Sequence, residues 1–159
     1  PNRLSREQRL TASTARIARL LGFVSMDIEA GIHLCYGDPG HKHIIEPADL
    51  STCVAYANGI AQASARPVNF IHMPVPRDRS DAAYFAPLGA LSLPAETDLY
   101  LGLVHFTDGA DGAAARLAVA LASSADHVGS FGIATECGFG RRDPVTILPL
   151  LGIHATVAG

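Results

Sequence analysis

Residues 98–106 read Asp-Leu-Tyr-Leu-Gly-Leu-Val-His-Phe, and they are followed by the glycine-rich segment 107–112 and the alanine-rich segment 113–123. The first segment is almost continuously apolar, which is typical of a strand covered on both faces of a parallel sheet. The second has the composition of a turn, and the third has high helix propensity. This stretch therefore predicts a strand, a turn and a helix in direct succession, which is one βα unit.

The same alternation extends along the rest of the chain. Apolar runs bounded by turn residues predict further strands at 31–37, 67–75 and 128–138. Helical periodicity and helix start signals predict helices at 5–23, 47–64, 82–88 and 144–157. Four strands that alternate with helices predict an α/β fold with a parallel sheet.

The length of the chain limits how far such a fold can extend. An eight-stranded barrel of βα units needs about 200 residues or more, whereas this chain has 159. We therefore expect a single domain, 1–159, that is either a small open α/β sheet or the C-terminal half of a (β/α)8 TIM barrel. The chain begins at Pro1 rather than at a methionine, which fits a processed or truncated product.

A half barrel leaves two edge strands and an apolar inner face that must be covered. We therefore expect the partner of this chain to be a second copy, in a homo-oligomer, or a complementary half-barrel chain.

Composition disfavours several classes of protein. The chain is 48% hydrophobic and 17% charged, as ordinary globular proteins are. Its 12 Lys and Arg residues against 15 Asp and Glu give no excess positive charge, so we expect no nucleic-acid partner. No apolar run reaches the roughly 18 residues of a membrane span and no signal-peptide pattern is present, so we expect no membrane partner and a cytoplasmic location. We interpret the three cysteines as thiols, because three cannot all pair within one chain.

Histidine and cysteine side chains gather where the predicted strands end. His33 and Cys35 are two residues apart on one predicted strand, so both point to the same face. His72, His105 and Cys137 lie late in the other three strands. The C-terminal ends of parallel strands lie together, and active sites form there. Because imidazole and thiolate are ligands that zinc prefers, these residues predict a metal site, and the alternative is that they only pack in the core.

Further candidates lie in loops and helices, and most have two interpretations. Arg77 and Arg141 follow the second and fourth strands, where they either hold a substrate carboxylate or phosphate or are solvated. Asp38, after the first strand, either contacts a substrate or forms a turn. We interpret His43 as a solvated loop side chain, with substrate contact as the alternative, and Cys53 as a buried, inert thiol.

Two short motifs carry a family resemblance. Residues 33–38 read His-Leu-Cys-Tyr-Gly-Asp, and residues 134–142 read Ala-Thr-Glu-Cys-Gly-Phe-Gly-Arg-Arg. These motifs resemble the catalytic barrel of cobalamin-independent methionine synthase and its relatives in the uroporphyrinogen decarboxylase-like superfamily. The resemblance extends from about residue 10 to the end of the chain. It implies that the four strands are the last four of a (β/α)8 barrel.

The resemblance also implies a ligand set. His33, Cys35 and Cys137 correspond to zinc ligands of the family, and His72 stands where the family has a glutamate ligand. A site of two histidines and two cysteines still suits zinc, but it is less negative by one carboxylate. His105 corresponds to the family histidine that assists proton transfer during methyl transfer.

The function implied by this resemblance is a zinc-dependent, methyltransferase-like activity that moves a methyl or alkyl group from a donor to a small thiol. Zinc would lower the pKa of the thiol, and His105 would move a proton. Asp38, Glu136, Arg77 and Arg141 would hold polar substrate groups. The alternatives are a metal-independent lyase or decarboxylase of the same superfamily, in which arginines hold substrate carboxylates, and a non-catalytic half-barrel subunit.

Overall fold

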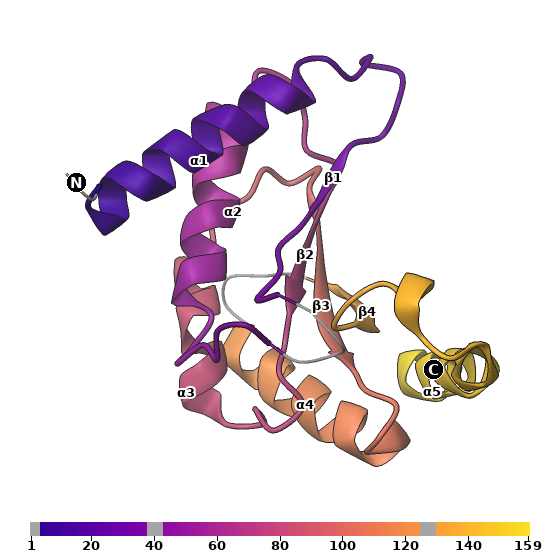
Figure 1. The fold of residues 1–159 in the computed structure, drawn as a ribbon. Coiled ribbons are helices and arrows are strands. Elements are labelled where there is room, and N and C mark those ends of the chain that lie inside the picture. The colour runs from indigo at the N-terminus through magenta and orange to yellow at the C-terminus, as the bar shows by residue number, and fades with distance from the viewer. Residues whose placement is uncertain (1–3, 38–42, 125–129) are drawn as a thin grey trace.

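A four-stranded parallel sheet forms the centre of the structure, a computed structural model that describes residues 4–37, 43–124 and 130–159 (Figure 1). The strand order is β1-β2-β3-β4, and every neighbouring pair is parallel. The strands are β1, Gly31–His33; β2, Phe70–Pro74; β3, Asp98–Val104; and β4, Gly132–Thr135. The α/β fold of parallel βα units that the sequence predicts is therefore confirmed.

Helices alternate with these strands along the chain. They are α1, Arg6–Leu21; α2, Ser51–Ala63; α3, Ala82–Phe85; α4, Gly109–Ser124; and α5, Ile147–Ala158, with short 3-10 helices at Ala86–Ala90, Phe139–Arg141 and Pro144–Thr146. Ser5 caps α1 in a reciprocal pair of hydrogen bonds with Gln8. Within the described ranges, no helix combines the length and apolar character needed to cross a membrane.

The helix α4 begins earlier than the sequence predicts, inside the glycine-rich segment. The Gly112 amide donates to the Asp108 carbonyl, which makes the first helical turn there. The carboxylate of Asp108 is held in turn by Arg116 of the same helix. These two contacts offset the low helix propensity of the glycines.

The helices α1 to α4 form one layer on one face of the sheet, and α5 packs on α4 and on the strands β3 and β4. Neighbouring helices contact one another in chain order, α1 with α2, α3 with α4 and α4 with α5, and Figure 1 shows α1 to α4 on the same side of the strands. The sheet side chains under this layer are fully or almost fully buried: Ile71, Met73, Leu99, Leu101 and Leu103. This layer therefore contains the main hydrophobic core.

The opposite face of the sheet is open among the described residues. Phe70 of β2 and Tyr100 of β3 are 38% and 36% exposed on it, with their rings in edge-to-face contact. They line a concavity of about 490 Å³ together with Glu29, Asn69, His72, Asp98 and Ala134. An aromatic pair on an otherwise uncovered sheet face is available for contact with another molecule.

All four strands end earlier than the sequence predicts, β2 by a single residue. The β1 strand ends at His33, so Cys35 lies in the following loop rather than on the strand. The chain turns there because Gly37 has a φ of +92°, a conformation that glycine adopts without strain, and its amide folds back onto Cys35 Sγ. His105 directly follows β3, and Cys137 lies two residues beyond β4.

The sheet curls so strongly that the loops after its two outer strands meet. The β1 and β4 strands lie at opposite edges of the sheet. Yet Cys35 Sγ, after β1, lies 3.8 Å from Cys137 Sγ, after β4, and His43 Nε2 lies 2.6 Å from Glu136 Oε1. The curl therefore gathers residues from both edges at the C-terminal end of the strands.

Candidate metal site

Three side chains bring their ligand atoms together at this end of the sheet. The sulfur atoms of Cys35 and Cys137 are 3.8 Å apart, and Cys137 Sγ lies 3.8 Å from His33 Nε2. All three ligand atoms lie within 4.8 Å of one another. His33 and Cys35 are exposed and Cys137 is partly exposed, so a ligand can reach them from solvent. A histidine and two thiols at these distances could hold a metal ion.

The loop that carries Cys35 is anchored in the core. The Gly37 amide donates a hydrogen bond to Cys35 Sγ at 3.3 Å, which holds the sulfur against the turn. Between these two residues, the Tyr36 hydroxyl contacts the Tyr84 hydroxyl at 3.2 Å and accepts from the Cys53 thiol. Cys53 is 3% exposed, and burial raises the pKa of its thiol to about 11, so it is the buried, inert cysteine that the sequence predicts.

His72 lies beside His33, because the two residues are register partners in β2 and β1. Their Nδ1 atoms are 2.6 Å apart and their ring planes differ by 16°. Burial, and then the neighbouring His33, lower the pKa of His72 to about 4. The structure thus places His72 against the Nδ1 edge of His33, whereas Cys137 lies on the Nε2 side, and His72 is outside the group of three converging ligands.

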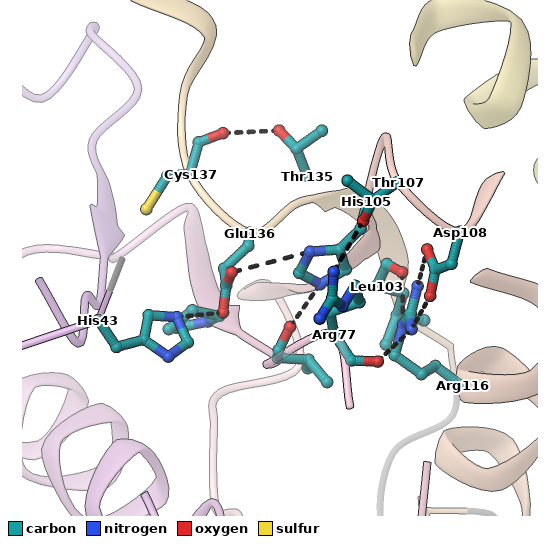
Figure 2. A network of polar contacts seen from close by, with 12 residues as sticks. His43, Arg77, Leu103, His105, Thr107, Asp108, Arg116, Thr135, Glu136 and Cys137 are labelled. Carbon is teal, nitrogen blue, oxygen red and sulfur yellow. Dashed lines mark hydrogen bonds and ion pairs between the residues drawn. The ribbon is translucent and has the colours of Figure 1, made fainter. Parts of the chain in front are cut away.

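Glu136 lies between two imidazole rings, as Figure 2 shows. Its Oε1 is 2.6 Å from His43 Nε2, and its Oε2 is 3.8 Å from His105 Nδ1. His43 also contacts Glu46 at 3.1 Å, and its side chain is only 13% exposed. Burial opposes a charge on His43, but the two carboxylates outweigh this effect and raise its pKa. The interpretation of His43 as a solvated loop side chain is therefore wrong.

His105 is held in one orientation by the backbone. Its Nε2 donates to the Val75 carbonyl at 2.8 Å, and the residue is 8% exposed. Since a carbonyl only accepts, the proton of the neutral ring is on Nε2 and the lone pair of Nδ1 faces Glu136. Burial lowers the pKa of His105 to about 4, and the cations Arg116 and Arg142 lower it as well. His105 is thus a neutral base at pH 7 with its free nitrogen directed toward a carboxylate.

A buried arginine supports the loops that carry these groups. Arg116 of α4 is 1% exposed, donates to the carbonyls of Leu103 and Arg77, and pairs with Asp108 at 2.7 Å (Figure 2). It therefore ties the ends of β2 and β3 together next to His105. The sequence contained a signal for this role, because Arg116 is the one charged residue of the alanine-rich segment 113–123.

The remaining residues that the sequence predicts for the site are Arg77, Asp38 and Arg141. The side chain of Arg77 is exposed beyond β2, with a 3.4 Å contact to the Thr107 hydroxyl. Asp38 and the side chain of Arg141 lie outside the described residues. The neighbouring Arg142 is close enough to lower the pKa of His105, and its buried Nε has no hydrogen-bond partner in the described part of the chain.

Comparisons with protein families, with curated proteins and with solved structures find no match to this chain. The resemblance of the two motifs to the methionine synthase superfamily therefore stays a prediction.

Proposed function

We propose that this chain binds zinc through His33, Cys35 and Cys137 and transfers a methyl or alkyl group to a small thiol. The observation that carries the proposal is the spacing of the ligand atoms. Tetrahedral zinc with ordinary bond lengths separates two cysteine sulfurs by about 3.8 Å, and a sulfur from an imidazole nitrogen by about 3.6 Å. The Cys35–Cys137 and Cys137–His33 distances here are both 3.8 Å, and all three ligand atoms lie within 4.8 Å of one another. Thiolate and imidazole also favour zinc over magnesium or calcium, which prefer oxygen ligands.

Three converging protein ligands fit a catalytic site better than a structural one. Structural zinc sites are closed by four protein ligands, whereas catalytic sites keep one position for water or substrate. The exposure of His33 and Cys35 gives a small molecule access to that position. Zinc bound there would lower the pKa of a substrate thiol and so supply a thiolate at neutral pH.

His105 provides the acid-base group of the proposal. With Nε2 fixed on the Val75 carbonyl, its Nδ1 can accept a proton and later return it to a leaving group. Glu136, 3.8 Å from this nitrogen, stabilises the imidazolium that results. The arginines beyond β2 and β4, Arg77 and Arg142, are the groups that would hold an anionic part of the substrate.

We also propose that the four βα units are half of a (β/α)8 barrel. In doubly wound sheets the strand order reverses and helices cover both faces. In this sheet the order runs without reversal and the helices α1 to α4 lie on one side of the strands, which is the arrangement of a barrel segment. The open face with Phe70 and Tyr100 would then pack against a complementary half, supplied by a second copy or by another chain.

Metal content tests the proposal. Plasma mass spectrometry on protein purified without a metal-affinity step should find about one zinc per chain. Cys137→Ser should lose it, and Cys53→Ala should retain it, because Cys53 is a free thiol outside the group of three. Zinc retained by Cys137→Ser, or absent from the wild type, contradicts the proposal and leaves the metal-independent lyase and the half-barrel subunit as alternatives.

A further inference from the structure

We propose that His72 is a positioning residue of the metal site and not one of its ligands. It accepts a hydrogen bond from Nδ1 of His33 and so keeps Nε2 of His33 turned toward the two cysteine sulfurs. This inference rests on the metal site proposed above. It assigns to His72 a role that differs from the place in the ligand set that the sequence suggests.

The two nitrogens of His33 face different side chains. Its Nε2 lies 3.8 Å from Cys137 Sγ, and its Nδ1 lies 2.6 Å from His72 Nδ1. When Nε2 of a neutral imidazole gives its lone pair to a metal ion, the ring proton resides on Nδ1. That proton then points at His72 Nδ1, which must be the acceptor. Metal-binding histidines generally make such a hydrogen bond through the second nitrogen, and it fixes both tautomer and ring orientation.

His72 directs its remaining nitrogen, Nε2, away from His33. With its Nδ1 engaged by His33, His72 carries its own proton on Nε2. That atom lies toward β3 and β4: a Cβ added at Gly102 would lie only 3.2 Å from it. The Thr135 carbonyl is on the same side and acts to raise the pKa of His72, although it is not aligned as a hydrogen-bond acceptor among the described residues. Nδ1 of His72 thus faces His33, and its Nε2 lies toward Gly102 and the Thr135 carbonyl rather than among the three converging ligand atoms.

The sheet fixes the pair, since His33 and His72 are register partners and the Leu34 amide donates to the His72 carbonyl at 2.9 Å. Gly102 leaves room for the His72 ring, because a Cβ there would lie 3.2 Å from His72 Nε2. Because the His72 ring is held between β1 and β4 in this way, the sheet fixes the orientation of His33, the first ligand.

Cobalt binding by two variants tests the inference. His72→Ala removes the acceptor, whereas His72→Asn keeps an oxygen acceptor close to the former position of Nδ1. We expect the cobalt-loaded wild type and both variants to share the same visible absorption bands, because the ligand set does not change. The cobalt affinity of His72→Ala should fall by about 10-fold to 100-fold, and His72→Asn should recover most of that loss.

Two outcomes would overturn the inference. Altered cobalt bands in both variants would show that His72 is a ligand, and an unchanged affinity in His72→Ala would show that it does not support the site. A wild type that binds no cobalt or zinc would instead defeat the metal site itself.

A second measurement on the wild type needs no variant to fold. In the zinc-loaded, ¹⁵N-labelled protein, nuclear magnetic resonance should detect a slowly exchanging proton on Nδ1 of His33. A zinc-loaded protein in which Nδ1 of His33 is the metal-bound nitrogen would also overturn the inference.

Discussion

Glu136 directs its two carboxylate oxygens at different imidazole rings, and the two contacts have different chemical consequences. The contact with His43, at 2.6 Å, joins a carboxylate to a histidine whose pKa is raised, so it favours a charged pair. The contact with His105, at 3.8 Å, is too long for a hydrogen bond. One side of the carboxylate therefore holds a loop in place, while the other faces a nitrogen that is still able to accept a proton.

The pH dependence of stability follows from the burial of His105. Its pKa is about 4 in the folded protein against an ordinary value of 6.5, so the unfolded chain takes up the proton first as the pH falls. The contribution of neutral His105 to stability is complete above about pH 6.5 and is lost as the pH falls toward 4. Between about pH 6 and pH 4.5, we expect wild type to lose about 1 kcal/mol more per pH unit than His105→Gln, measured by urea unfolding.

The comparison of wild type with His105→Gln removes the effect of His43 on the pH dependence of stability. That effect is opposite in sign to the effect of His105. The raised pKa of His43 gives stability that is lost as the pH rises through that pKa. Because His43 is present in both proteins, its contribution cancels in the difference. Unfolding free energies that change in parallel with pH would contradict a buried neutral His105.

At the scale of elements, β3 and β4 approach each other closely at Gly102. A Cβ at this position would lie 2.8 Å from Glu136 Cα, which is backbone that cannot simply rotate away. We expect Gly102→Ala to displace β4, to lower the free energy of unfolding by about 1–3 kcal/mol and to weaken metal binding through Cys137. Gly152→Ala is the matched control, since a Cβ on that α5 residue meets nothing within 4 Å. Equal stability and metal affinity in the two variants would contradict the close approach.

The helix α4 is tied to the strand ends by Arg116. Removal of this side chain leaves the carbonyls of Leu103 and Arg77 without their donor and Asp108 without its ion pair. We expect Arg116→Met to lower the free energy of unfolding by about 3 kcal/mol. Arg19→Met, on the exposed surface of α1, should change it by less than about 0.5 kcal/mol. Urea denaturation followed by circular dichroism measures both, and a small loss in Arg116→Met would show that the network is not structural.

The alternation of apolar runs and turn segments was sufficient to predict the elements, because it reflects strands buried under a layer of helices. Strand ends were harder, since the end of β1 depends on the turn at Gly37 and on a bond from its amide to the Cys35 sulfur. His43 and Glu136 are 93 positions apart, and only the curl of the sheet brings them together. No local pattern in the sequence encodes that curl.

At the scale of the whole molecule, the open face of the sheet is the feature with the largest consequence. Phe70 and Tyr100 are exposed there, and the outer strands β1 and β4 have unpaired edges within the described ranges. We expect the chain, when purified alone, to self-associate, so that light scattering gives a mass above the 16.6 kDa of one chain. Phe70→Lys should shift this mass toward that of the monomer.

The control for this variant is Leu20→Lys, which adds the same charge at a residue that is 66% exposed on α1, in the helix layer that covers the other face of the sheet. It should leave the mass unchanged. A wild-type mass of 16.6 kDa at micromolar concentration would contradict self-association, and an equal effect of both substitutions would show that the open face is not the contact.

Cys35 and Cys137 are 102 positions apart in the chain, yet they meet at 3.8 Å. Contacts between residues so distant in sequence form late in folding, because a long loop must close before they contribute. His33 and Cys35 are available early, whereas Cys137 joins them only after β4 has docked at the far edge of the sheet. We therefore expect the proposed metal site to be completed late in folding, and a chain that stops before Cys137 to keep only the weaker affinity of a two-residue site.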